Sequence, residues 1–235
     1  MARSIADQTV AELGGPTSVL VRQREDHAEL GRLLAELDGT TGREQERVLR
    51  RIDRLVFSHA FAEETVLWPV IRRVLPDGDA LTRQVEEEHQ EVNELVSRLE
   101  TLGHDDPRRA ETLDRLVEVL NEDVRDEEDV MFPRLQEALD AKALRRLGLQ
   151  WEVARRVSPT RPHPTVSRRP PGNAVSGLPL SLLDRTRDLV DAGVQRAPER
   201  FAPAGEVVSR TLASASGWVE RVPLARRGDG PPTAR

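Results

Sequence analysis

The sequence has no cysteine among its 235 residues and few aromatic residues, namely three tryptophans, four phenylalanines and no tyrosine. Without cysteine, disulfides, thiolate metal ligands, iron–sulfur clusters and cysteine nucleophiles are excluded, which leaves the chemistry of histidine and carboxylate side chains. The scarcity of aromatic residues argues against a base-stacking platform for nucleic acid. No stretch approaches the ~20 apolar residues of a membrane span, and the start lacks an apolar run of signal length. We therefore expect a soluble cytoplasmic protein.

Charge and proline divide the chain at about residue 156. Residues 157–235 hold 12 arginines and 7 acidic residues, a net of +5, so residues 1–156 hold the other 23 basic and 34 acidic residues, a net of −11. An acidic surface attracts neither nucleic acid nor anionic lipid. Eleven of the 16 prolines also lie after residue 156. We expect residues 1–156 to form the folded domain and residues 157–235 a Pro/Arg-rich, largely irregular tail, with a short amphipathic helix near residues 181–192.

Two segments of the first domain repeat each other, HAFAEETVLWP over residues 59–69 and DVRDEEDVMFP over residues 123–133. Each places a glutamate four residues after its first residue, so His59 pairs with Glu63 and Asp123 with Glu127. Groups four apart share one face of a helix, and the surrounding apolar residues fall on that same face. Buried carboxylates are costly unless they are neutralised, paired or bound to a cation. The repeat therefore predicts a cation site.

A second repeated element precedes each of these segments and contributes a histidine to the same apolar face. His27 and His89 are 62 residues apart, and His59 and Asp123 are 64 residues apart, which indicates two helical hairpins of equal size. The remaining histidine and glutamate residues are interpreted as follows. His163 lies between prolines, away from a metal partner. Five glutamates fall off the apolar stripes and are expected to be exposed, namely Glu29, Glu64, Glu86, Glu91 and Glu128. The predicted metal ligands are His27, His59, Glu63, His89, Asp123 and Glu127.

Nitrogen and oxygen ligands without sulfur suit iron, manganese or zinc, and six ligands exceed what one tetrahedral zinc ion binds. Two metal ions are therefore expected, with Glu63 and Glu127 able to bridge them and the imidazoles as terminal ligands. A ferritin-like site is a weaker alternative, because it uses Glu-xx-His spacing whereas here the histidine precedes the glutamate by four.

The order and spacing of these motifs over roughly residues 17–140 resemble the hemerythrin-like, or HHE cation-binding, domain family. The resemblance implies an up-down four-helix bundle around a non-haem di-iron centre of the Fe-O-Fe type, with manganese or zinc less expected. Such a centre meets dioxygen, peroxide or another small diatomic ligand. The family pattern carries His27, His59, Glu63, His89 and Glu127 over as iron ligands. It usually has histidine where this chain has Asp123, and some members have a second histidine where this chain has Asn93.

The expected fold is all-α, an up-down four-helix bundle of two helical-hairpin repeats followed by an extra helix and the tail. Breakers at Asp38–Gly42, Pro76–Gly78 and Gly103–Pro107 separate the helices, and Pro69 is expected to kink or loosen the second one. The first helix is expected from Thr17 to about Leu37 and the second from about Arg43 to Val74. The third follows the Pro76–Gly78 breaker and runs to about Leu102, and the fourth opens with Asp105 or Asp106 as its cap. A further helix is expected from about Leu139 to Arg156.

Three functions follow from this reading. The leading one is a di-iron protein that binds or reacts with dioxygen or a related small oxidant, for sensing, storage or detoxification, and the motifs do not separate binding from enzymatic turnover. The second is an iron- or redox-responsive interaction module in which the tail engages a protein partner. The third is a structural helical bundle without metal.

Overall fold

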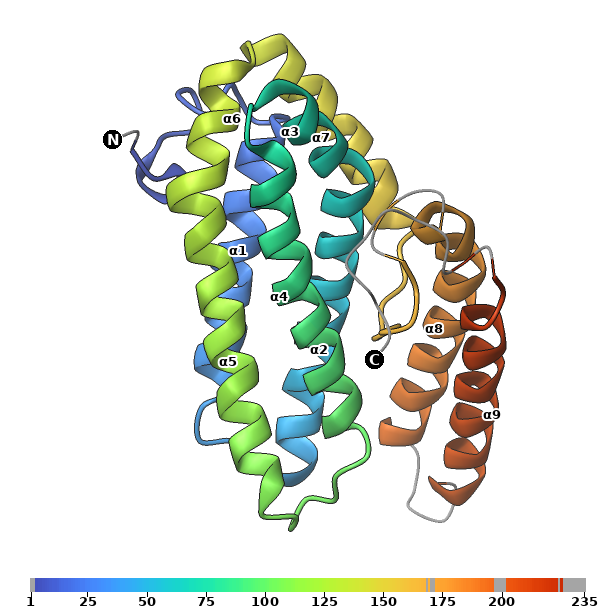
Figure 1. Cartoon of the computed structure of the whole chain (residues 1–235). Coiled ribbons are helices and arrows are strands. Elements are labelled where there is room, and N and C mark those ends of the chain that lie inside the picture. Colours follow the sequence, from blue (N-terminus) through green and yellow to red (C-terminus); the bar gives the residue numbers. More distant parts are fainter. Residues whose placement is uncertain (1–2, 168, 170–171, 197–201, 224, 226–235) are drawn as a thin grey trace.

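The computed structural model describes residues 3–167, 169, 172–196, 202–223 and 225, and this part of the chain contains helices and no strands. Four long helices form an up-down bundle (Figure 1), which confirms the predicted fold class. Neighbours in sequence pair along their lengths, the first with the second and the third with the fourth, as two hairpin repeats require. The four helices are α1 (Val19–Leu37), α2 (Gly42–Ala62), α4 (Gly78–Leu99) and α5 (Arg108–Asp126).

The second and fourth bundle helices each continue through a five-residue π-helical segment. In the second, η2 (Glu63–Leu67) leads into α3 (Trp68–Val74), and in the fourth, η3 (Glu127–Met131) leads into α6 (Phe132–Ala138). The amide of Trp68 donates to the carbonyl of Glu63, five residues back, and Phe132 donates to Glu127 in the same way.

Proline explains why these segments occur twice at the same place. Pro69 and Pro133 follow the π-helical segments by two residues; each lacks an N–H, and its ring crowds the carbonyl four residues earlier. A wider turn ahead of the ring relieves that contact, and single π-helical turns often lie at functional sites. The predicted loosening at Pro69 therefore takes the form of a π-helical turn, which starts at the inward-facing glutamate.

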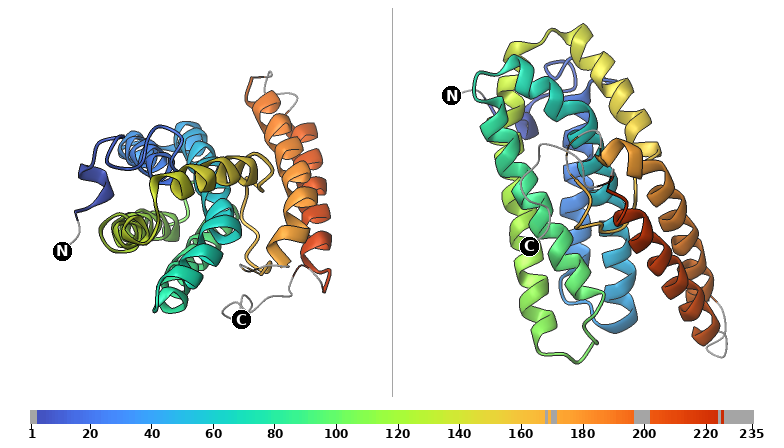
Figure 2. Two further views of the ribbon diagram at one scale, coloured as in Figure 1. Left: turned by 90° about the horizontal axis from the view of Figure 1, so that it is seen from above. Right: turned by 45° about the vertical axis from the view of Figure 1, so that its right-hand side comes forward.

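The extra helix α7 (Ala141–Arg156) begins at Asp140, whose side chain accepts a hydrogen bond from the amide of Ala143. It packs along α1, α2 and η2. Gly148 permits the closest approach, because a Cβ there would lie 2.0 Å from the carbonyl oxygen of Thr17. The helix therefore belongs to the bundle, as Figure 2 shows from above.

The core of the bundle has two apolar clusters with a polar layer between them. One cluster surrounds Trp68, Phe132 and Trp151, and the other lies at the opposite end around Ile52 and Leu116. The first three bundle helices contribute to both clusters, and the fourth reaches the first cluster through η3 and α6, so all four pass through the polar layer. All six predicted ligands lie in this layer.

The tail is more regular than expected, since it contains α8 (Gly172–Arg196) and α9 (Ala202–Glu220). The predicted helix near residues 181–192 is therefore the middle of a longer one, the second helix was missed, and the description of the tail as largely irregular was wrong for the described residues. The two helices pack side by side, outside the bundle (Figures 1 and 2).

The prediction for His163 is also corrected in part, because this side chain is buried and has two acidic partners. Its Nε2 lies 3.0 Å from Asp184 Oδ2 and its Nδ1 lies 2.9 Å from Glu220 Oε1. Its backbone amide donates to the side chain of Asn93 at 2.9 Å. His163 thus anchors the tail to α4.

Among the described residues, no helix combines the length and the apolar character that crossing a lipid bilayer requires.

Candidate metal centre

The structure brings all six predicted ligands into the polar layer, and each of them is buried. His27 comes from α1, His59 from the last turn of α2 and His89 from α4. Asp123 lies near the end of α5, and the two glutamates open the two π-helical segments. Glu63 and Glu127 are fully buried, with no exposed surface.

The Nε2 atoms of the three histidines point to the carboxylates at the centre. His27 Nε2 lies 3.2 Å from Glu127 Oε2, and His59 Nε2 lies 3.1 Å from Glu63 Oε1. The two imidazoles meet, with their Nε2 atoms 3.3 Å apart. On the other side, His89 Nε2 is 3.6 Å from both Glu63 Oε2 and Asp123 Oδ1.

The predicted ligands form two groups of three residues, and the two groups share one residue. Within each group the ligand atoms lie within 4.8 Å of one another. His27, His59 and Glu127 form the first group, and Glu63, His89 and Glu127 form the second. Glu63 also approaches the first group, through His59. Asp123 belongs to neither group but borders the second through His89. Each group offers donor atoms for a cation, and the carboxylate of Glu127 belongs to both groups.

The carboxylates at the centre lack donors that would satisfy them. Both oxygens of Glu63, both oxygens of Glu127 and Oδ1 of Asp123 are buried without a hydrogen bond of good geometry from any described residue. Unsatisfied buried carboxylates are rare and need an explanation. A bound cation supplies one, and the oxygen and imidazole donor set suits iron, manganese or zinc.

Each ligand histidine uses its other ring nitrogen to contact a carboxylate outside the central group. Such pairing holds the imidazole in one orientation and directs Nε2 towards a metal. The three pairs are His27 Nδ1 with Glu128 Oε1 at 2.9 Å, His59 Nδ1 with Asp26 Oδ2 at 3.0 Å, and His89 Nδ1 with Glu64 Oε1 at 3.0 Å.

These contacts correct the expectation that five glutamates are exposed. Glu64 is 2% exposed and Glu128 is partly buried, because both face ligand histidines. Glu86 is fully buried and pairs with Arg72 and Arg169. The remaining two, Glu29 and Glu91, lie at the surface with intermediate exposure.

Sequence reasoning missed Asp26, Glu64 and Glu128 as partners of the histidines. The signal available was the glutamate doublet, which stands at the same place in both repeats. A wheel of 3.6 residues per turn places the second glutamate of each doublet off the apolar stripe, but the doublets open wider π-helical turns, where that spacing does not hold.

Each ligand imidazole also contacts a larger aromatic ring of the apolar cluster. Phe132 stacks on His27 with centroids 6.3 Å apart, Trp68 stacks on His89 at 6.3 Å, and the edge of Trp151 meets His59 at 5.6 Å. These rings cover the polar layer from one end.

The histidines of this metal-free cluster hold protons strongly. Burial alone disfavours the imidazolium of His27, but Glu127 and Glu128 outweigh it and raise the pKa to about 9. Burial also lowers the pKa of His89, but Asp123 and Glu64 outweigh it and raise this pKa to about 10. The His59 pKa is also raised, against burial, by Glu63 and Asp26.

The central acids are shifted in the same direction. Burial, reinforced by the neighbouring Glu63 carboxylate, raises the pKa of Glu127 to about 7. The pKa of Asp123 rises well above its ordinary value, first through burial and then through Glu127. Because the ligand groups hold protons more strongly than usual, cation binding must compete with protons.

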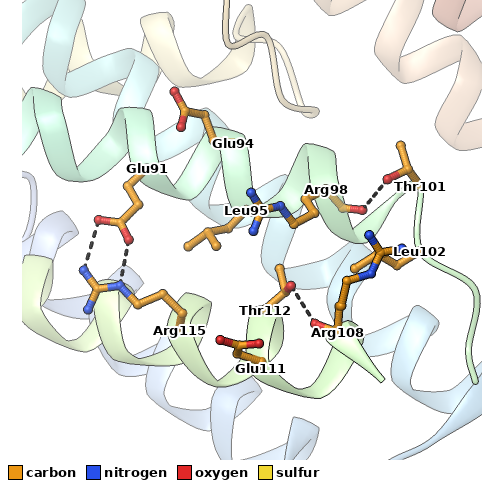
Figure 3. Close-up of a pocket in the computed structure, with 10 residues that line it drawn as sticks. All are labelled: Glu91, Glu94, Leu95, Arg98, Thr101, Leu102, Arg108, Glu111, Thr112 and Arg115. Carbon is orange, nitrogen blue, oxygen red and sulfur yellow. Dashed lines mark hydrogen bonds and ion pairs between the residues drawn. The ribbon is translucent and has the colours of Figure 1, made fainter. Parts of the chain in front are cut away.

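A surface groove of about 660 Å³ lies between α4 and α5, away from this cluster. In Figure 3 its walls carry both signs of charge, and Arg115 forms a two-point ion pair with Glu91. None of the six predicted ligands lines the groove. We assign it no role.

Fold and site together define a four-helix-bundle protein with a buried histidine and carboxylate cation site. The hemerythrin HHE cation-binding domain matches residues 18–135, half of the chain. The chain belongs to this family.

Two curated relatives resemble the bundle. An uncharacterized hemerythrin-like protein of Schizosaccharomyces pombe is 26% identical over 134 residues, which are 57% of this chain and 66% of that protein. A DNA nickase of Nostoc sp. is 23% identical over 133 residues, 56% of this chain and 37% of the nickase. The chain thus aligns with less than two thirds of either relative. No solved structure matches it significantly.

Proposed function

We propose that the protein is a non-haem di-iron protein that binds or reacts with dioxygen or a related small oxidant. The observation that carries the proposal is the pair of three-residue groups that share Glu127. One carboxylate between two sets of imidazole and carboxylate atoms is the arrangement that a two-metal site requires. Family membership adds a preference for iron, while manganese and zinc fit the same donor atoms less specifically.

In this proposal the six side chains have distinct roles. Glu63 and Glu127 would be shared by the two metal positions, because each approaches ligands of both. His27 and His59 would hold one metal ion, and His89 with Asp123 would hold the other. The iron pair, when bound, supplies electrons to the oxidant. The chain keeps the site dry and orients the imidazoles through their carboxylate partners.

Asp123 gives the site a charge that the usual histidine of the family lacks. Three carboxylates and three imidazoles make a harder, more anionic ligand set, which favours ferric iron and weakens reversible dioxygen binding. We therefore place reaction with an oxidant ahead of oxygen storage.

Metal analysis after anaerobic purification and iron reconstitution tests the proposal. We expect about two irons per chain and, after air is admitted, the absorption band of an oxo-bridged iron pair. Less than about one iron per chain would instead favour a structural bundle without metal.

A second candidate is an iron- or redox-responsive module that uses the tail, residues 157–235, as a unit distinct from residues 1–156. It is favoured by one contact chain: His163 of the tail donates to Asn93, and Asn93 donates to the carbonyl of His89 at 2.9 Å. Limited proteolysis of the tail with and without iron tests it, and unchanged cutting would count against it. We do not assign the nicking activity of the Nostoc relative to this chain, because the alignment covers 37% of the nickase.

A further inference from the structure

The last helix, α9, turns an apolar side to solvent. Trp218 is 74% exposed, and Val207, Val208 and Val222 are between 46% and 56% exposed. Val207, Thr211, Trp218 and Val222 follow one another at intervals of four, seven and four residues, so they share one side of the helix. At 1.5 Å per residue this side is roughly 22 Å long. We call these five residues the α9 stripe.

The side of α9 that packs on α8 carries small polar residues instead. Ser209 and Ser216 are buried, and Ser209 accepts a hydrogen bond from Arg187 of α8 at 2.9 Å. The helix packs along α8, and Figure 1 shows it at the edge of the molecule. A surface helix ordinarily buries its apolar side and exposes its polar one. The reversed arrangement leaves the α9 stripe open for a further contact.

The charges of the tail select the kind of partner. Residues 157–235 carry a net charge of +5. Four acidic residues of the tail have described side chains, and all four pair inward with His163 or Arg161; the most exposed of them retains 24%. Arg221, which follows α9 directly, is exposed. The outer surface at α9 is therefore apolar and basic, which complements an apolar surface of negative charge. The four acidic residues are Asp184, Asp188, Asp191 and Glu220.

We propose that the α9 stripe docks on an anionic lipid surface, with Trp218 at the level of the headgroups. A helix that has tryptophan and aliphatic residues on one side and basic residues nearby lies in the plane of such a surface. The indole ring suits this boundary, because it is apolar and carries one N–H donor. Arginine near the surface adds attraction to anionic headgroups. The proposal does not depend on the metal site.

The acidic bundle does not stand against this contact. Figures 1 and 2 show α8 between α9 and the bundle. A helix with its side chains is about 10 Å wide, which exceeds the ~8 Å over which charges act at physiological ionic strength. The bundle's negative charge is therefore largely screened from a surface that touches the α9 stripe.

A second copy of this chain fits the stripe less well. Two α9 stripes placed face to face would bring two basic surfaces together, each with an exposed Arg221, and like charges repel. A stripe placed on the acidic bundle of another copy would be a heterologous contact, which adds copies without limit unless the rotation closes a ring. A lipid surface satisfies the apolar residues and the arginine together.

The first test uses the tryptophans of the chain. Trp68 and Trp151 are fully buried, so a change of emission on addition of vesicles reports on Trp218. The full chain is titrated with vesicles of phosphatidylglycerol mixed with phosphatidylcholine, and with vesicles of phosphatidylcholine alone. With the anionic vesicles we expect emission at shorter wavelength and binding that weakens as salt is added, and with the neutral ones much weaker binding. Unshifted emission with anionic vesicles, or equal binding to both kinds, overturns the proposal.

The second test compares variants by vesicle sedimentation. Trp218→Ser should raise the dissociation constant for anionic vesicles by about tenfold or more, since the largest apolar side chain of the stripe is lost. Arg221→Gln should have a smaller effect and reduce the salt dependence. Val222→Ser, a second change within the stripe, should weaken binding even if Trp218→Ser unfolds α9. Its matched control is Val153→Ser on α7, a valine that is 63% exposed, and this variant should bind like the wild-type protein.

Unchanged binding of both Trp218→Ser and Val222→Ser overturns the proposal. Light scattering over a range of protein concentrations tests the other occupant, and we expect Trp218→Ser to leave the molecular mass unchanged. Self-association that Trp218→Ser abolishes would assign the stripe to a second copy and overturn the proposal. None of these measurements requires bound metal, so a failure to bind iron would reject the proposed function and leave the lipid result standing.

Discussion

At the scale of single residues, the site is built from side chains that would destabilise the bundle if nothing bound them. Glu63 and Glu127 have no exposed surface, and their oxygens lack well-formed hydrogen bonds within the described chain. A hydrophobic core tolerates such groups when a cation or a proton neutralises them. The binding of metal and the stability of the fold are therefore linked.

Glu127 is the residue whose loss should affect both metal positions. Glu127→Ala removes the member that the two ligand groups share, so we expect iron loading to be lost, and the double variant with Glu63→Ala should bind none. Iron per chain is the measurement. Glu91→Ala, which removes a surface carboxylate paired with Arg115, is the control and should load normally. A fully loaded double variant would contradict the assignment.

Asp123 should set the electronic character of the site. Asp123→His replaces an anionic group by a neutral one, and we expect a higher reduction potential and more reversible dioxygen binding. Redox titration and repeated oxygenation cycles compare the two proteins. Identical behaviour would remove the argument from ligand charge.

The pH dependence of stability follows from the raised pKa values. His27 and His89 have pKa values of about 9 and about 10 in the folded protein, against ~6.5 in an unfolded chain. Between pH ~6.5 and these raised values the folded protein therefore binds more protons than the unfolded chain. That stabilisation is complete below ~pH 6.5 and is lost as pH rises through 9 to 10. Glu127, with a pKa raised to about 7, acts in the same direction at lower pH.

We therefore expect the metal-free protein to lose stability as pH rises from about 6 to 9, while zinc affinity increases over the same range because protons no longer compete. Urea unfolding of metal-free protein and zinc titrations at several pH values measure the two trends. Stability that increases with pH, or zinc affinity that decreases with it, would contradict the pKa assignments.

At the scale of elements, the close contact between α7 and the start of α1 depends on Gly148. A Cβ there would lie 2.0 Å from the Thr17 carbonyl oxygen, so Gly148→Ala should destabilise the protein by roughly 1–3 kcal/mol through overpacking. Gly31→Ala is the matched control. Gly31 lies in α1 with nothing within 4 Å of a new Cβ, and alanine there should stabilise by about 0.5–1 kcal/mol. Equal effects in urea unfolding would refute the close packing.

The bundle helices were predictable because their apolar residues recur at helical spacing and breakers separate them. The ligands were predictable for the same reason, since His59 and Glu63 interrupt an apolar stripe at a spacing of four. Glu64 and Glu128 were not, because the π-helical turns that orient them change that spacing.

The predicted helix at residues 181–192 was shorter than α8 for a different physical reason. Its buried face is mainly polar, while several of its large apolar residues face outward, so the usual relation between hydrophobicity and burial fails. Asp184 and Asp188 are buried because they accept hydrogen bonds from residues 160 and 161. The exposed residues are Val175, Leu178, Leu182 and Leu189.

At the scale of the whole molecule, the tail is held against the bundle by buried charges. Arg161 is 2% exposed and reaches Asp188 at 2.8 Å and Asp191 at 2.6 Å on α8, and Glu100 of the bundle at 3.5 Å. Across the boundary between tail and bundle, Arg161 pairs with Glu100 and Arg169 pairs with Glu86. The uneven charge of the sequence has a structural use.

Removing this arginine should release the tail helices. Arg161→Ala removes the ion pairs to Asp188, Asp191 and Glu100, while Asp188 and Glu100 keep Arg54 and Arg50 as partners, and we expect it to weaken docking by roughly 1.5–3 kcal/mol. Faster proteolysis after residue 157 is the measurement. Arg221→Ala, which changes an exposed arginine directly after α9, is the control. Equal cutting of both variants and the wild-type protein would contradict this role.

The most direct test of the account is an anomalous-scattering map from crystals of the iron-loaded protein. We expect two iron peaks, about 3.5–4 Å apart, between Glu63 and Glu127 and within reach of His27, His59 and His89. A map without iron in this layer, or with iron bound at the protein surface alone, would contradict it.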